Sequence, residues 1–166
     1  MRVIFCAVSI LLVSLTNNFA QEPVNEGVTG KREILKNVHR VSVRITLNDV
    51  AQAVVDPSAL KARTESQLKS GEISVVSALD PELAVFEIHV ELAADLENYG
   101  GTVEAFLKQP VGLLHQDPPA RPVLATTWNV PIGICSGSGR IRAVVQDVAV
   151  LVTDNFISDY NNANGR

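Results

Sequence analysis

The sequence predicts an α+β two-layer sandwich, with a mostly antiparallel sheet of four to five strands and two helices on one face. Several segments alternate apolar and polar residues with a period of two, which is typical of strands with one buried face. Two other segments place apolar residues at helical spacing. The segments follow the order strand, helix, three or four strands and helix, which suits this architecture.

The chain begins with the features of an export signal, predicted over residues 1–20. Arg2 precedes an apolar run over residues 3–15, and Ala20 is a small residue at a cleavage point. The run is shorter than the roughly 20 apolar residues that a permanent membrane-spanning helix needs. The protein is therefore predicted to be exported, to the periplasm or outside the cell, with no integral membrane span after cleavage. An uncleaved N-terminal anchor is the alternative.

Cysteine content and charge restrict the partners and the chemistry. Cys135 is the only cysteine outside the signal, so no internal disulfide is expected, and Cys6 lies too near the start of the signal for lipid attachment. The formal net charge is −4, with acids and bases interleaved. This pattern argues against nucleic acid, which requires a basic face, and against an anionic membrane surface as the main partner.

A single domain is predicted over residues 34–164, after a polar and flexible leader over residues 21–33. Its first element is a strand over residues 38–47, whose side chains alternate between two faces. The apolar face holds Val41, Val43, Ile45 and Leu47, and the polar face holds Arg40, Ser42, Arg44 and Thr46.

A helix is predicted next. Asp56 suits the N-cap, Pro57 suits the first helical position, and Gly71 is expected to end the helix in a left-handed conformation. The helix has a thin apolar stripe of Ala59, Leu60 and Leu68. A short strand over residues 73–76 is predicted to follow, because its residues are mostly β-branched or apolar.

Three more strands are predicted over residues 81–95, 102–114 and 122–132. Paired glycines indicate a turn over residues 96–101, and three prolines indicate a loop over residues 115–122. Pro110 has no backbone N–H, so a bulge or an edge position is expected there. The last element is a helix over residues 141–160 with an apolar stripe. The stripe consists of Ile141, Val144, Val145, Val148, Leu151, Val152 and Phe156.

The stretch GICSGSGR, residues 133–140, is a candidate for a catalytic loop. Gly133, Cys135 and Gly137 have the spacing of a nucleophile elbow, in which small neighbours expose the nucleophile. Such an elbow belongs to a strand, turn and helix of a parallel sheet, and it requires a positioned histidine. Because the strands before it look antiparallel and no histidine pattern accompanies it, Cys135 is a weak candidate for catalysis.

The same stretch is also a candidate for anion binding, because it precedes a helix whose N-terminal N–H groups attract anions. The residues involved would be Ser136, Ser138 and Arg140, although the spacing of a phosphate-binding P-loop is absent. The simplest interpretation is a flexible loop in which Ser136 or Ser138 caps the final helix.

Glu87, His89 and Glu91 lie on one face of the longest predicted strand and suggest either a metal site or a set of ion pairs. Same-face neighbours on a strand are roughly 6.5 to 7 Å apart, which is long for ligands of a single ion. Cross-strand pairing with Arg40 and Arg44 is favoured, if the first strand lies beside this one. No metal and no cofactor are predicted.

Two aromatic residues are further candidates for binding. Trp128 is more typical of a core or rim position than of a ligand platform, because its strand is otherwise half apolar. Tyr99, beside two glycines, could dock on a partner or lie on the surface of a turn. Phe156 and Tyr160 are expected to hold the last helix in place.

The domain also carries a recognisable pattern over most of residues 35–164. Its pieces are ESQLKSGEISVV, AVFEIHVELA, VEAFLKQPVGLL, ATTWNVPIG and VQDVAVLVTDNFISDYNNAN. They resemble a loose group of uncharacterised exported bacterial proteins, in which a strand ends in a tryptophan and a C-terminal helix ends in a Phe-x-x-Asp-Tyr stretch, here Phe156, Asp159 and Tyr160. The order of elements is similar, more distantly, to the lipopolysaccharide-assembly lipoprotein, an α+β envelope protein that chaperones a partner and begins at a lipidated cysteine.

The leading functional hypothesis is an exported, non-enzymatic domain. It would bind a secreted or envelope protein, or another envelope component, through its polar sheet face or an edge strand. One alternative is a hydrolase or redox enzyme that uses Cys135. Another is a small-ligand carrier with a cavity between sheet and helices, left by the short stripe of Leu60 and Leu68.

Overall fold

The computed structural model of the chain describes residues 33–36, 38–77, 83–111 and 123–166. The predicted signal, all but the last residue of the predicted leader, and the whole proline-rich segment 115–122 lie outside these residues. The proposed division of the chain into signal, leader and domain therefore stays a prediction.

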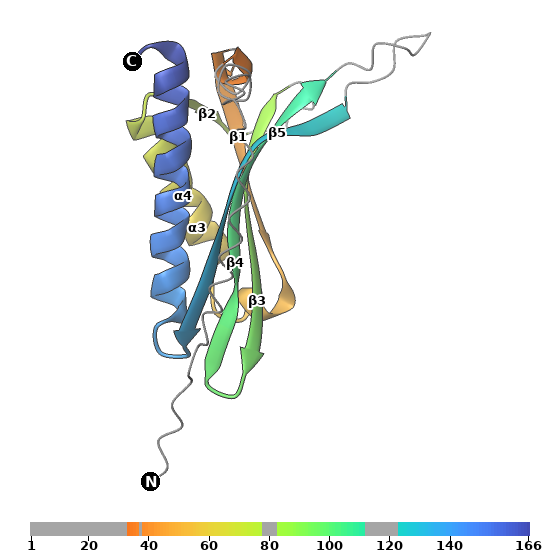
Figure 1. Ribbon diagram of the computed structural model, residues 1–166, viewed down its shortest axis with the longest axis vertical. Coiled ribbons are helices and arrows are strands. Elements are labelled where there is room, and N and C mark those ends of the chain that lie inside the picture. Colours follow the sequence, from red (N-terminus) through yellow and green to blue (C-terminus); the bar gives the residue numbers. More distant parts are fainter. Residues whose placement is uncertain (1–32, 37, 78–82, 112–122) are drawn as a thin grey trace, which may run out of the picture.

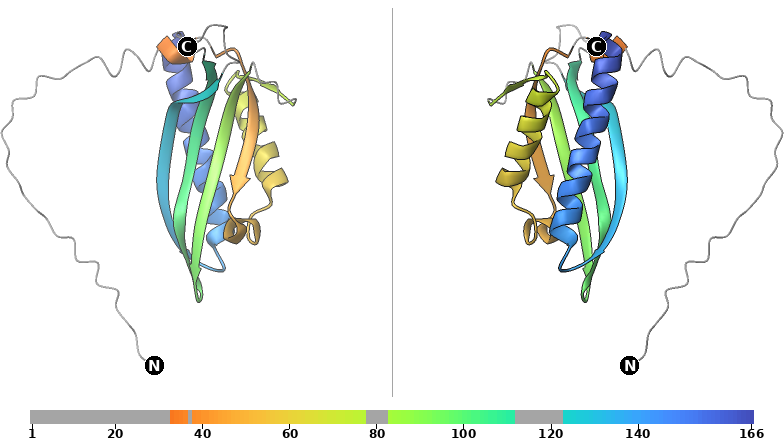
Figure 2. Two further views of the ribbon diagram at one scale, coloured as in Figure 1. Left: turned by 90° about the vertical axis from the view of Figure 1, so that its right-hand side faces the viewer. Right: turned by 90° about the vertical axis from the view of Figure 1, so that its left-hand side faces the viewer.

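The predicted α+β two-layer architecture is confirmed. Five strands form one sheet in the order β2-β1-β3-β4-β5. The strands are β1 (Arg40–Leu47), β2 (Ser74–Val76), β3 (Ala84–Asp95), β4 (Asn98–Val111) and β5 (Val123–Gly137). Two long helices, α3 (Pro57–Ser70) and α4 (Ile141–Asn164), lie side by side on one face of the sheet (Figures 1 and 2). A short helix, α2 (Asp49–Gln52), follows β1. None of the helices in the described part of the chain is long and apolar enough to cross a membrane.

The sheet is mixed, and most of its residue pairs are antiparallel. β1 is parallel to both of its neighbours, β2 and β3, while β4 runs antiparallel to β3 and β5. The helix between β1 and β2 carries the chain back to the starting end of the sheet, which makes β2 parallel to β1. Strands β3, β4 and β5 follow one another directly in the chain, which suits their antiparallel pairing.

Helix α3 begins as predicted and ends differently. The side chain of Asp56 accepts hydrogen bonds from the backbone N–H groups of Ser58 at 2.8 Å and Ala59 at 3.2 Å. Gly71 is not left-handed, because its φ is −83°, and the positive φ of 61° falls on Glu72. A glycine is nevertheless favoured at position 71, because a Cβ there would lie 2.7 Å from Cγ2 of Ile157 on α4.

The later strands are longer than the sequence indicates. The residues that pair across the β3–β4 hairpin include Asp95 with Asn98, so the turn holds only residues 96 and 97 and the paired glycines belong to β4. β5 continues to Gly137 and includes most of the stretch GICSGSGR. The ladder irregularity lies between Leu107 and Lys108, and Pro110 lies beyond the last β4 residue paired with β3, which makes it locally an edge residue.

The core lies between the sheet and the two long helices. It contains an aromatic cluster in which the ring centroids of Phe86 and Phe156 are 4.7 Å apart, and those of Trp128 and Phe156 are 5.1 Å apart. The expected stripe of α4 is confirmed except at two positions: Val144 is half-buried and lies outside the core cluster, and Leu151 is 49% exposed. On α3 the buried residues are Leu60, Thr64 and Leu68, and Ala59 is exposed.

Candidate functional site

The face of the sheet opposite α3 and α4 has no helix packed on it in the described part of the chain (Figure 2). We call this the open face. Register places residues of three strands in cross-strand rows on it, and most of these residues are polar. Arg44 is opposite Glu87, which is opposite Phe106, and Thr46 is opposite His89, which is opposite Glu104. The alternation within each strand therefore gives a buried apolar face and an open face that is mainly polar, with Phe106 as an exception.

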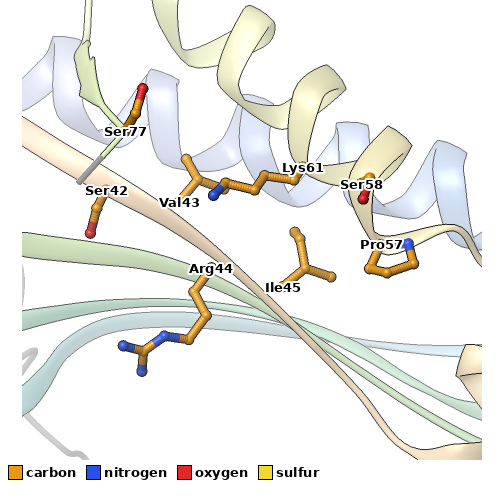
Figure 3. A pocket seen from close by; sticks show the side chains of 8 residues that line it. All are labelled: Ser42, Val43, Arg44, Ile45, Pro57, Ser58, Lys61 and Ser77. Carbon is orange, nitrogen blue, oxygen red and sulfur yellow. The ribbon is translucent and has the colours of Figure 1, made fainter. Parts of the chain in front are cut away.

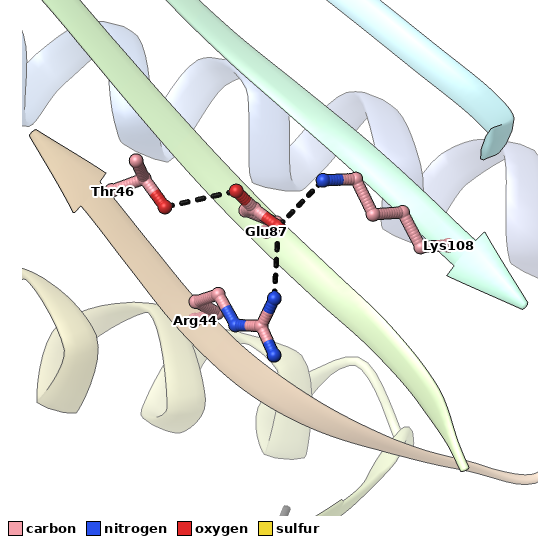
Figure 4. Close-up of polar contacts among 4 residues, drawn as sticks. All are labelled: Arg44, Thr46, Glu87 and Lys108. Atoms are coloured by element: carbon pink, nitrogen blue, oxygen red, sulfur yellow. Dashed lines mark hydrogen bonds and ion pairs between the residues drawn. The ribbon is translucent and has the colours of Figure 1, made fainter. Parts of the chain in front are cut away.

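Glu87 is the centre of a polar cluster on the open face (Figure 4). Its Oε2 lies 2.8 Å from Nζ of Lys108 and 3.7 Å from a guanidinium nitrogen of Arg44. The hydroxyl of Thr46 donates a hydrogen bond of 2.9 Å to its Oε1. The cluster joins β1, β3 and β4 through one carboxylate that is only 6% exposed.

The surroundings of Glu87 favour its charged form. Burial by itself raises the pKa of this carboxyl, because it disfavours the charge. The hydrogen bonds from Lys108 and Thr46, together with the charges of Lys108 and Arg44, outweigh burial and hold the pKa of Glu87 below its ordinary value. The carboxylate is therefore a fixed negative charge at neutral pH.

The expected cross-strand ion pair is present for Arg44 and Glu87, whereas Arg40 lies opposite Ser74 and takes part in none of the ion pairs between described residues. Sequence reasoning missed Lys108 and Thr46 as partners of Glu87. The sequence pattern places both residues on polar strand faces, but it does not give the pairing of β3 with β4 that brings Lys108 to Glu87. No group of three or more His, Cys, Asp or Glu side chains within the described ranges is placed to hold a metal ion.

The second feature is the edge of β1. β2 pairs only with residues 40–42 of β1, so residues 43–47 have no strand partner on that side within the described ranges. We call residues 43–47 the free edge. The backbone N–H of Asn48 donates to Val90 on β3, so by alternation the N–H and C=O of Ile45 point away from β3. The side chain of Gln52 already donates to the C=O of Leu47, at 3.0 Å.

A groove of about 260 Å³ runs along the free edge (Figure 3). β1 forms one side of it and the first turns of α3 form the other. Val43 and Ile45 point toward α3, whereas Ser42 and Arg44 point to the opposite side of the strand. The groove is lined by Ser42, Val43, Arg44, Ile45, Pro57, Ser58, Lys61 and Ser77.

The other candidate residues lie away from this groove. Cys135 is exposed near the end of β5, where it pairs with Gly100 in an antiparallel ladder, so the parallel strand, turn and helix of a nucleophile elbow is not formed. None of the hydrogen bonds between described residues joins Cys135 to a histidine. His39 lies before β1 and His89 lies within β3.

The predicted serine cap of the last helix is wrong. The N-cap residue of α4 is Arg140, and no side chain makes a cap hydrogen bond there. The hydroxyl of Ser136 donates to Gly137 O at 3.3 Å, and the backbone N–H of Ser138 donates to Glu97 O at 2.7 Å. The backbone bond from Ser138 instead ties the start of α4 to the β3–β4 turn. Anion binding by Ser136, Ser138 and Arg140 stays a prediction.

The two candidate aromatic residues differ in burial. Trp128 is 4% exposed and lies in the aromatic cluster, where its indole Nε1 donates a 2.8 Å hydrogen bond to Asp159 on α4. Trp128 therefore lies in the core, as the sequence pattern favoured. Tyr99 is half-buried in β4, opposite Ala94 and Ser136, and belongs to a strand rather than to a turn.

These features define a two-layer α+β protein with an open sheet face and, among the described residues, a β1 edge that is only partly paired. Comparison with protein-family models gives no match, and comparison with curated proteins gives none either. Solved structures similar to this chain include PelC from Paraburkholderia phytofirmans, described as a dodecamer. It is 14% identical, with a TM-score of 0.42, over 74% of this chain and 86% of that chain.

Two other similar structures are described as lipoproteins. Rare lipoprotein B from Shewanella oneidensis is 9% identical, with a TM-score of 0.37, over 75% of this chain and 96% of that chain. A minor lipoprotein from Acinetobacter baumannii is 10% identical, with a TM-score of 0.30, over 71% of this chain and 93% of that chain. At these identities and TM-scores, no function follows for this chain.

Proposed function

We propose that this chain is an exported, non-enzymatic domain that binds an extended segment of a partner protein along the free edge of β1. The observation that carries the proposal is the shortness of β2, which leaves residues 43–47 without a strand partner among the described residues. Unpaired N–H and C=O groups at a sheet edge are a template for another strand. The backbone of Ile45 supplies both groups toward the groove.

The surroundings of the edge support this proposal. The groove leaves room beside β1, and its apolar side, formed by Val43, Ile45 and Pro57, offers contact area for alternate side chains of an added strand. Sheet edges that are not used for binding are commonly protected by short strands, charges or covering loops. Here charged side chains flank the edge without closing the groove.

A screen of displayed peptides against the purified chain, followed by backbone amide mapping by NMR, tests the proposal. Peptides that bind should be extended, and they should slow hydrogen exchange at the amides of Ile45 and Leu47. Amides of β4, which lie between two strands, serve as the internal control. Selected peptides that perturb the region of Cys135 and leave the β1 amides unchanged would refute strand addition.

A further inference from the structure

We infer that the groove along the free edge takes an acidic segment, in which apolar and acidic residues alternate. This inference rests on the proposed function of strand addition and adds the chemistry of the partner. The juxtaposition that carries it is that of Arg44 on β1 and Lys61 on α3, which line the same groove.

The described lining of the groove is positively charged although the chain is not. Arg44 and Lys61 are its charged residues, and none of the described residues that line it carries a carboxylate. The whole chain has a formal net charge of −4. A cationic groove in an acidic protein attracts anionic segments and disfavours basic ones, because charges across an interface mainly determine specificity.

Both cations keep hydrogen-bonding capacity for a ligand. Arg44 lies 3.7 Å from Glu87, whose Oε2 is already held by Lys108 at 2.8 Å. Lys61 lies 3.8 Å from Glu65, one turn along α3. The two cationic side chains are 41% and 43% exposed. These long contacts leave most of the guanidinium and ammonium N–H groups available, and a planar guanidinium can bind a carboxylate through two bonds.

The side chains of the groove also explain why apolar and acidic residues should alternate in the bound segment. Val43 and Ile45 point toward α3, while Arg44 and Ser42 point to the other side (Figure 3). Successive side chains of an added strand would point to these two sides in turn. Residues on the first side would contact the apolar wall, with Lys61 at its rim, and residues on the second would meet Arg44.

Ser42 provides an independent indication of a polar ligand. It lines the groove and is 2% exposed, and its hydroxyl has no hydrogen-bond partner among the described residues. A buried hydroxyl without a partner is costly, and an added carboxylate on the Arg44 side would satisfy it. The free edge of five residues matches a segment of about 17 Å at a strand's rise of about 3.3 Å per residue.

The test uses three blocked peptides of alternating sequence, with valine at odd positions and glutamate, glutamine or lysine at even positions. Their binding to the purified chain is measured by fluorescence anisotropy at low and high salt. The glutamate peptide is expected to bind tightest, and its advantage over the glutamine peptide should shrink as salt rises. Replacing Arg44 or Lys61 with glutamine should reduce that advantage roughly two- to fivefold each.

Matched variants separate charge from structure. Arg44→Lys should keep much of the preference, and Lys69→Gln on the same helix, outside the groove, should change nothing. A glutamate peptide that carries N-methyl groups on alternate backbone nitrogens should lose binding, because methylation removes the donors of the added strand.

The outcomes separate the two proposals. If the three peptides bind equally and the methylated one does not, strand addition stands and the acidic partner is refuted. If none binds, both proposals fail. Sedimentation of the chain alone provides a further check. A dimer that dissociates on dilution and competes with the peptides would mean that a second copy occupies the edge, which would also refute the acidic partner.

Discussion

Lys108 and Glu87 form an ion pair of 2.8 Å on the open face, between neighbouring antiparallel strands. The guanidinium of Arg44 approaches the same carboxylate oxygen only to 3.7 Å, from the parallel strand on the other side. One carboxylate is therefore shared unequally by two cations. Lys108 makes the short contact that joins β4 to β3, and Arg44 makes only the longer contact from β1.

The stability of the protein should decrease in acid partly through Glu87. A group whose folded pKa is depressed contributes stability above its unfolded pKa, and this contribution is lost as pH falls through the folded pKa. The free energy of unfolding should therefore fall as pH drops below about 4.5, the ordinary value for this group. Urea denaturation over a pH series measures this free energy. In the Glu87→Gln variant the free energy of unfolding should depend less on pH in acid than in the unaltered protein. The same pH dependence in both proteins would contradict the prediction.

Lys108 and Arg44 should differ in their effect on stability. Lys108→Met removes the short hydrogen bond to a nearly buried carboxylate, so it should cost about 1–2 kcal/mol in the free energy of unfolding. Arg44→Gln removes a long and half-exposed contact, and should cost less than about 0.5 kcal/mol. Chemical denaturation at neutral pH compares the two. Equal losses in the free energy of unfolding would contradict this prediction, because they would show that Lys108 and Arg44 stabilise Glu87 equally.

Gly101 should be intolerant of any side chain. A Cβ at this position would lie 1.9 Å from the carbonyl oxygen of Glu91 and 2.9 Å from its carbonyl carbon, both backbone atoms of the neighbouring strand. Gly101→Ala should therefore destabilise the protein by more than about 2 kcal/mol, through forced separation of β3 and β4. Gly100→Ala is the control, because its nearest neighbour would be 3.9 Å away. Similar thermal stability of the two variants would rule out this steric account.

Replacing Leu96 with asparagine should stabilise the protein. It lies in the two-residue turn between β3 and β4 with a φ of 53°, and it is 96% exposed. The left-handed region disfavours residues with a branched carbon chain, and asparagine tolerates it better. Leu96→Asn should raise the free energy of unfolding by about 1 kcal/mol. Leu96→Ala keeps the Cβ and should show little gain, so an equal gain from both variants would place the cause elsewhere.

Local patterns sufficed for the two long helices, for the presence of the strands and for part of the candidate site, but not for the bounds of the later strands. The alternation around Arg44 and Glu87 put both on polar strand faces, and Asp56 with Pro57 marked the start of α3. These signals depend on residues close together in the sequence, where periodicity and capping act.

The features that the sequence did not predict depend on contacts between residues that are distant in the chain. The approach of Lys108 to Glu87 depends on a hairpin turn of only two residues, with the paired glycines inside β4 rather than in the turn. The groove exists because β2 ends at Val76. Its cationic lining combines Arg44 of β1 with Lys61, which looks like an ordinary polar residue of a helix surface. The parallel order of β2, β1 and β3 is likewise decided by tertiary packing.

Trp128 and Asp159 should stabilise the protein as a pair, because the indole Nε1 donates a 2.8 Å hydrogen bond to the carboxylate across the layer between β5 and α4. Asp159→Ala leaves this nearly buried donor without its partner and should cost about 1–3 kcal/mol. Asp147→Ala, at an exposed site on the same helix, is the matched control. Trp128 is the only tryptophan, so its fluorescence reports both unfolding and the local environment. Its emission should change in the folded Asp159 variant alone, and equal spectra with equal stability would show that the bond contributes nothing.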